Sequence, residues 1–236
     1  MSGAKLDLQR IVVIGRTFEE YLRMFNLQRE ELAGRRILDC PAGVCSFTAA
    51  ANQLGAEAIA ADIAYCHSAE VLMEKGIKDI QHAMLQLGKV QQNFLWNEFK
   101  SIEELKQART EALTASTLDR QQNEERYISA VLPQLPFADL SFELTLSAHF
   151  LFMYSDRLDY DFHLQSLQEL MRVTSEEIRI FPLIDLSGRR YEEMDRLIEY
   201  IHTQGWNTEE LKVSYEFQKG ANTMLRLTRT RGMQSA

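Results

Sequence analysis

The stretch that decides the fold runs from Arg36 to Thr48, with the sequence RILDCPAGVCSFT. A short apolar run ends on Asp39, a turn containing Gly43 follows, and the remainder predicts the start of a helix. Further along the chain a second apolar run, AEAIAAD, ends on Asp62. A strand, a turn with room for a ligand, a helix and a second strand ending in an acid predict half of a nucleotide-binding α/β fold.

The residues of the turn suit a ligand. Pro41 has a fixed φ and no N–H, so it belongs beyond the pairing positions of the strand, and Gly43 permits a positive φ or a close backbone approach. The helix expected over 46–54 would direct its free N–H groups toward the turn. Asp39 and Asp62 would end adjacent parallel strands, where two acids are costly unless solvent or a ligand pairs them. A P-loop is excluded because no Gly-Lys-Ser/Thr follows.

Composition narrows the function classes. The chain has 236 residues, 45% of them hydrophobic and 25% charged, which suits one α/β domain with an appendage. A formal net charge of -8 disfavours binding to the phosphate backbone of nucleic acid. No apolar run reaches the ~18–20 residues that cross a bilayer. The N-terminal stretch lacks the apolar core of a signal peptide, so we expect a cytoplasmic protein without a membrane partner.

Three cysteines, an odd number, argue against a disulfide framework. Cys40 and Cys45 flank the turn and Cys66 follows the second strand, but their spacing matches no paired C-x-x-C pattern and only His67 is adjacent. We therefore expect no metal site, and buried reduced thiols that pack as small apolar side chains.

The residues before the first strand predict a short helix. The run Ile11–Ile14, closed by Gly15, has the pattern of a first dinucleotide-binding strand but lacks the further glycines. The residues that follow carry a capping-box pattern and an apolar stripe at helical spacing. Two interpretations stay open for Arg16 and Tyr21: they cover a bound ligand, or they are a surface cation and a packing aromatic.

The composition changes again over residues 66–124, which lack proline and are rich in Gln, Glu, Lys, Leu and Ala. A plain crossover needs only about a dozen residues, so this stretch predicts a helical insertion or lid of two or three helices. It would interrupt a domain spanning 36–236, preceded by an N-terminal helical segment at 1–35. The aromatic residues between Phe94 and Phe99 either line an acceptor pocket or, as we favour, form the insertion's own core.

The remaining chain alternates strand and helix patterns. Its last two apolar-alternating runs, with a hairpin signal at 219–222 between them, predict an antiparallel end to a mostly parallel sheet. We expect strands at 127–131, 142–147, 177–181, 211–217 and 223–227, and helices at 159–173 and 191–202.

These motifs together resemble a known family. Residues 37–45 resemble the first motif of class I S-adenosylmethionine-dependent methyltransferases, an acid followed by a G-x-G-x-G turn, and Asp62 resembles their ribose-binding acid. The segment LPFADLSF at 135–142 is similar to the one leading into their fourth strand, and 167–173 looks like the helix before their fifth. The resemblance implies a Rossmann-like methyltransferase fold, with a seven-stranded, mostly parallel sheet of order 3-2-1-4-5-7-6 and strand 7 antiparallel.

The chain departs from the family pattern at the turn, where Pro41 and Cys45 replace the first and third glycines, and before LPF, where no acid stands. The resemblance implies S-adenosylmethionine as cofactor, with Asp39 facing its amino group and Arg16 its carboxylate. The cofactor-binding residues expected on this basis are Arg16, Tyr21, Asp39, Cys40, Pro41, Ala42, Gly43, Asp62, Ile63, Val131, Leu132 and Ser147.

Methyl transfer is an in-line displacement, so the protein mainly supplies alignment and desolvation. A base is needed only when the acceptor must lose a proton. His149, just past the fourth strand, is the best-placed candidate, and Tyr154 is a second. His149 is equally consistent with a helix cap or a packing role. We expect a small-molecule acceptor because the chain is acidic and the insertion can close over a ligand.

Two other function classes remain. A non-catalytic protein of the same fold would bind the cofactor or a partner, using the helical insertion as an interface, and a homo-oligomer is compatible with this. A nicotinamide-dependent oxidoreductase would also place Asp62 on a ribose. It is disfavoured because Pro41-x-Gly43-x-x-Ser46 departs from G-x-G-x-x-G at both ends.

Overall fold

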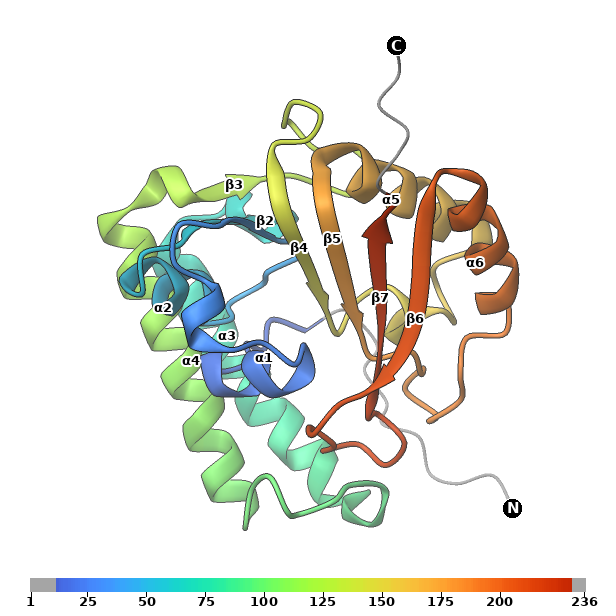
Figure 1. Ribbon diagram of the computed structural model, residues 1–236. Helices are drawn as coiled ribbons and strands as arrows, with labels where there is room; N and C mark the ends of the chain where they lie inside the picture. The colour runs from blue at the N-terminus through green and yellow to red at the C-terminus, as the bar shows by residue number, and fades with distance from the viewer. Residues whose placement is uncertain (1–11, 231–236) are drawn as a thin grey trace.

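The computed structural model describes residues 12–230, which build a seven-stranded sheet of order β3-β2-β1-β4-β5-β7-β6 (Figure 1). β1 pairs in parallel with β2 and β4, and β7 runs antiparallel to both β5 and β6. The predicted Rossmann-like methyltransferase sheet is therefore confirmed in order and in direction.

The strands and helices have the following bounds. The strands are β1 Arg36–Asp39, β2 Glu57–Asp62, β3 Tyr127–Ser129, β4 Phe142–Ala148, β5 Thr174–Phe181, β6 Trp206–Lys212 and β7 Thr223–Arg229. The α-helices are α1 Phe18–Met24, α2 Phe47–Gln53, α3 Ala69–Gly88, α4 Ile102–Gln122, α5 Tyr160–Val173 and α6 Met194–Thr203, and short 3-10 turns η1 to η5 lie between them.

The central strands are buried on both faces because helices cover each side of the sheet. Ile37 and Leu144 contribute to one core, which includes buried side chains of α1, α2, α3 and α4. Leu38 and Ile178 face the other core, which is completed by α5 and α6. Alternate residues of each strand thus serve opposite layers, as the period of two requires.

The stretch at 66–124 contains the two long helices α3 and α4, which pack against each other and lie beside α1 and α2 (Figure 1). Their close approach depends on Gly76, where a Cβ would lie 2.8 Å from the methyl groups of Leu113. Among the helices between residues 12 and 230, none is long and apolar enough to cross a membrane.

The strand predicted at 211–217 is wrong in position, since β6 lies at Trp206–Lys212 and begins directly after Gly205. Val213, Tyr215 and Phe217 alternate with polar residues because they pack into the core shared with the insertion, and none of the three belongs to a strand of the sheet. The backbone confirms this, because the N–H of Leu95 donates to the carbonyl of Phe217 at 2.7 Å.

Phe94 and Phe99 of the insertion pack in the core, as favoured, but the insertion shares this core with the connection between β6 and β7. Phe94, Trp96 and Phe99 surround Phe217, with ring centroids 4.9, 5.6 and 5.4 Å from it. The connection between β6 and β7 therefore supplies the residue on which the insertion packs.

A buried ion pair ties the insertion to the N-terminal helix. Arg109 of α4 donates to both carboxylate oxygens of Glu20 in α1 at 2.5 and 2.8 Å, and Tyr215 donates to the same carboxylate at 2.7 Å. Burial alone would raise the pKa of Glu20, but the Arg109 guanidinium lowers it to about 2. The stabilisation from this pair is present above pH 4.5 and is lost as the pH falls toward 2.

We expect Arg109→Met to destabilise the protein by about 3–5 kcal/mol, because it leaves the Glu20 carboxylate buried without its cation. The double variant Glu20→Gln/Arg109→Met should lose less than the sum of the two single changes. The measurement is the free energy of unfolding from urea titrations at neutral pH. Lys106→Met, at an exposed position of α4, is the control, and additive losses in the double variant would contradict the expectation.

Candidate functional site

The turn between β1 and α2 is fastened to the end of β2 by Asp62. The N–H groups of Gly43 and Ala64 each donate to one carboxylate oxygen of Asp62 at 2.8 Å. Gly43 has a φ of 57°, and a Cβ there would meet nothing within 4 Å. The turn thus has the predicted positive φ at Gly43, and open space lies beside that residue.

Asp39, at the end of β1, has no exposed surface. Its Oδ1 accepts a hydrogen bond from the Tyr21 hydroxyl at 3.0 Å, whereas Oδ2 has no partner within the described part of the chain. Burial, opposed by the Tyr21 bond and reinforced by the charge of Asp62, raises the pKa of Asp39 to about 8. Asp39 is therefore a mostly protonated acid at neutral pH that faces no cation.

The N-terminal segment crosses the turn in direct contact. A Cβ on Gly15 would lie 2.0 Å from the carbonyl oxygen of Val44, so only glycine fits. The carbonyl of Arg16 accepts from the N–H of Ser46 at 3.0 Å, and the N–H of Arg16 donates to the Cys45 Sγ at 3.2 Å. The strand-like pattern at 11–15 does not give a strand over residues 12–15, and Ile11 lies outside the described residues.

Tyr65, which follows β2, also contacts the turn. The sequence motifs did not predict this residue as part of the site. Its hydroxyl donates to the carbonyl of Gly43 at 2.7 Å, and its ring stands edge-on to Tyr127 at 5.4 Å. Arg120 of α4 donates to the carbonyls of Tyr65 and His67. Only the tertiary fold brings these groups to the turn.

Two exposed apolar side chains flank Asp62. Ile63 is 60% exposed, and Val131 is 53% exposed in the connection after β3, where the N–H of Ala130 donates to the carbonyl of Asp62. Leu132, also predicted as a binding residue, is buried.

Ser147 lies on the face of the sheet opposite to Asp39. Asp39 pairs with Leu146 in the sheet, so these two side chains share a face and Ser147 points to the opposite one. Its Oγ is buried and has no partner in the region from 12 to 230.

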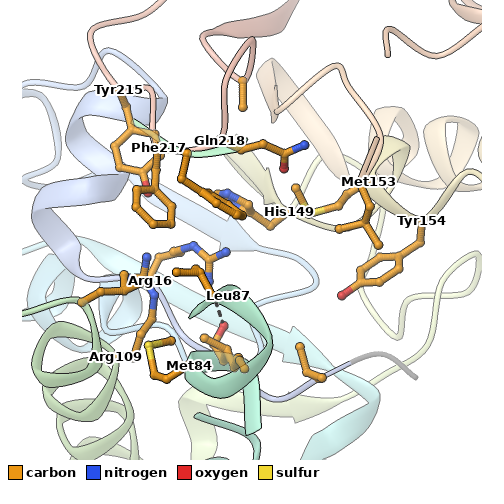
Figure 2. A pocket seen from close by; sticks show the side chains of 17 residues that line it. Arg16, Met84, Leu87, Arg109, His149, Met153, Tyr154, Tyr215, Phe217 and Gln218 are labelled. Atoms are coloured by element: carbon orange, nitrogen blue, oxygen red, sulfur yellow. Dashed lines mark hydrogen bonds between the residues drawn. The ribbon is translucent and has the colours of Figure 1, made fainter. Parts of the chain in front are cut away.

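A separate cavity of about 130 Å³ lies beside the turn (Figure 2). Its walls are mainly apolar and come from α3, α4, the insertion loop and the connection between β6 and β7. Of the predicted site residues, the lining includes Arg16, His149 and Tyr154, but not Asp39 or Asp62. The structure therefore divides the predicted site into two places, with the segment at 12–17 between them.

Arg16 extends into the middle of the cavity, near Met84, Leu87 and Arg109 (Figure 2). Its Nη1 donates to the carbonyl of Ile14 at 3.3 Å, and its Nε is buried without a partner among the described residues. This guanidinium thus has a donor available for a ligand.

His149 follows β4 with a φ of 54°, and its N–H donates to the carbonyl of Phe181 at 2.7 Å. Its Nδ1 is buried and has no partner in the described chain. Burial, followed by the charges of Arg16 and Arg109, lowers the pKa of His149 well below its usual range. Burial raises the pKa of Tyr154. At neutral pH the cavity therefore presents a neutral imidazole and a protonated phenol.

No protein-family model matches the chain. The chain is similar to the uncharacterized protein MJ0045 of Methanocaldococcus jannaschii, with 38% identity over 225 residues that cover 95% of this chain and 99% of the relative. The chain belongs to the MJ0045 family.

Solved structures resemble this MJ0045-family protein in fold. The PH0226 protein of Pyrococcus horikoshii OT3 is 13% identical, with 90% of each chain covered and a TM-score of 0.50. The magnesium protoporphyrin IX methyltransferase of Synechocystis PCC 6803, solved with bound SAM, is 14% identical over 90% of this chain and 91% of its own, with a TM-score of 0.44. Likeness of this degree concerns the fold alone.

Between residues 12 and 230 of this MJ0045-family protein, no group of three or more His, Cys, Asp or Glu side chains is arranged to hold a metal ion. Cys40 is buried and Cys45 is half-buried, but Cys66 is exposed, so the expectation of buried thiols is wrong at that position. Cys66 ends a 3-10 turn that projects only Tyr65 into the core.

We expect Gly15→Ala to cost about 3 kcal/mol of unfolding free energy, at the upper end of the range for overpacking, because its Cβ meets a backbone oxygen that cannot rotate away. The midpoint of urea unfolding measures this loss. Gly88→Ala is the matched control, since the nearest atom to its Cβ is 3.8 Å away, and it should stay within about 1 kcal/mol of wild type. Equal stability of both variants would show that the crossing over the turn is not as tight as described.

Proposed function

We propose that this protein is an S-adenosylmethionine-dependent methyltransferase with a small-molecule acceptor. The observation that carries the proposal is the pair of acids at the ends of β1 and β2. Asp39 is a buried acid with an unpartnered oxygen, and Asp62 lies beside the open space at Gly43. A buried acid without a cation is costly, and a ligand with an ammonium group would supply that cation.

The residues at the end of β2 fit the adenosine part of the cofactor. Each carboxylate oxygen of Asp62 accepts one backbone hydrogen bond and keeps a second lone pair, so the two oxygens can accept from two ribose hydroxyls. Ile63 and Val131 offer exposed apolar surface to the adenine ring. An acid at the end of a strand, with two exposed apolar side chains next to it, suits a nucleoside.

The residues at the end of β1 fit the amino group of the cofactor's methionine part. Asp39 Oδ2 is an acceptor without a donor, and the Tyr21 hydroxyl on Oδ1 holds the carboxyl group in position. Tyr21 thus acts on Asp39 in this structure and does not itself face open space.

The bound cofactor would supply a methyl group on a sulfonium. The chain's own side chains would orient the acceptor and exclude water from it. His149, with its lowered pKa, is a weak base at neutral pH, and Tyr154 keeps its proton. An acceptor that needs no strong base is therefore the better match to these two residues.

The test is calorimetric titration with S-adenosylmethionine and S-adenosylhomocysteine. We expect micromolar binding to the wild type and at least a tenfold loss in Asp62→Ala, because the two ribose hydroxyls lose their acceptors. Asp195→Ala, which removes an exposed acid of α6, is the control. Absence of binding to either ligand by folded protein would overturn the proposal.

One observation favours a second function, that of a non-catalytic binding protein of the same fold. The hydroxyls of Tyr65 and Tyr21 bond to Gly43 and Asp39, so the chain's own side chains already contact the turn. The form of this function in which the protein binds only a partner predicts no cofactor binding in the same titration, and binding of both ligands would exclude that form.

The ionisation of Asp39 makes cofactor affinity depend on pH. An ammonium ligand requires ionised Asp39, whose pKa is about 8 in the free protein, so binding releases a proton below that pH. We expect affinity for S-adenosylhomocysteine to rise by up to about tenfold per pH unit between about pH 6 and 8, where the ligand's own amino group begins to lose its proton. In Asp39→Asn this slope should disappear. Dissociation constants measured across this pH range test the prediction. A slope of zero for the wild type would show that Asp39 does not meet the amino group.

A further inference from the structure

We propose that the cavity at Arg16 and His149 binds a small, mostly apolar carboxylate whose anionic group lies on the Arg16 guanidinium. The binding itself needs no cofactor. Its interpretation as the acceptor site rests on the proposed function and names the substrate class as small apolar carboxylic acids.

The two arginines that line the cavity differ in their hydrogen-bond partners. Arg109 is fully paired, with both carboxylate oxygens of Glu20 as acceptors. Arg16 has one bond of 3.3 Å to a backbone carbonyl, and its Nε is buried without a partner among the described residues. A buried guanidinium with a free donor is satisfied best by a carboxylate, which takes two parallel hydrogen bonds.

The charged side chains of the cavity walls favour an anion. Among the described residues that line the cavity there is no Asp or Glu. Glu20, the nearest acid to Arg109, is already bound by Arg109 and Tyr215. An anion therefore gains from the field of Arg16, whereas the ammonium group of a cation or of an amino acid would find no acidic partner.

The imidazole of His149 is a further polar group at the same place. Its Nδ1 is buried and unpartnered among the described residues, and His149 lines the same cavity as Arg16. Buried polar atoms usually have a hydrogen-bond partner. A carboxylate oxygen beside Arg16 would give this imidazole an acceptor for its N–H.

The size and shape of the cavity limit the size of its occupant. The cavity holds about 130 Å³, and a cavity of ~150 Å³ in an engineered protein is known to hold benzene. Met84, Leu87 and Leu105 form the aliphatic walls, with Phe94 and Phe217 beside them. The enclosed part of the occupant is therefore about the size of one benzene ring or smaller, as in an aromatic or short branched carboxylic acid.

The cofactor's own carboxylate is the competing source of the same chemistry. It comes with an ammonium group on the adjacent carbon, and the cavity offers that group no acid. Asp39, the acid proposed for the amino group, does not line the cavity. The lining thus favours a carboxylate that carries an apolar body.

The experiment is calorimetric titration with benzoate, with benzamide and benzylamine as neutral and cationic probes of the same shape. We expect benzoate to bind at least tenfold more tightly than either. Arg16→Met, which keeps the length of the side chain, should lose this preference, and Arg16→Lys should retain part of it. Ala83→Leu, which fills the apolar part of the cavity and leaves Arg16 in place, should weaken all three probes.

Three results would overturn the inference: equal affinity for benzoate and benzamide, benzoate affinity unchanged in Arg16→Met, or no benzoate binding by folded wild type. Titrations with S-adenosylhomocysteine separate it from the proposed function. Benzoate binding without cofactor binding keeps the inference and removes the proposed function. Displacement of benzoate by S-adenosylhomocysteine, together with loss of cofactor affinity in Arg16→Met, would instead assign Arg16 to the cofactor's carboxylate.

Discussion

Glu20 accepts hydrogen bonds from Arg109, from Tyr215 and from the backbone N–H of Thr17, and these three donors come from α4, the connection before β7 and the start of α1. Both candidate sites depend on this carboxylate. It fixes the start of α1, and thereby the positions of Arg16, two residues before the helix, and of Tyr21, the residue after Glu20. Its pairing with Arg109 leaves Arg16 as the arginine of the cavity that has no ion pair within the described chain.

The two acids at the strand ends differ in the groups that offset the cost of burying a carboxylate. Burial raises the pKa of Asp62, and the two backbone N–H groups that donate to its carboxylate oppose that rise. Asp39 has one hydroxyl donor and no cation, and its raised pKa leaves it mostly neutral. Asp62 can thus accept hydrogen bonds from hydroxyl groups, and Asp39 can ionise when a positive group binds beside it.

The sequence predicts the parts of the fold that depend on local pattern. The run ending on Asp39, the positive φ of Gly43 and the acid at Asp62 follow from strand and turn chemistry, and the resemblance supplies the order of the sheet. The predicted position of β6 was wrong because Tyr215 and Phe217 alternate with polar residues for a tertiary reason. They pack against helices that are far away in the chain. Local periodicity cannot distinguish a sheet partner from a helix partner.

The candidate site shows the same division. The rule that parallel strands present ligand-binding residues at their carboxyl ends indicated Asp39, Asp62 and His149. It gave no means of assigning Tyr65 to the turn or Arg109 to Glu20, because these contacts join residues 22 and 89 positions apart. Nor could it separate Asp62 from His149, which share an edge of the sheet but face different spaces.

Gly15 lies against the Val44 carbonyl with no room between them, and Arg16 follows it directly. The segment therefore cannot slide along the turn. A displacement of the turn would therefore displace the backbone of Arg16, which lies between the two candidate sites. A molecule at one place and a molecule at the other would share a coupling free energy, and thermodynamic linkage makes that energy equal in both directions.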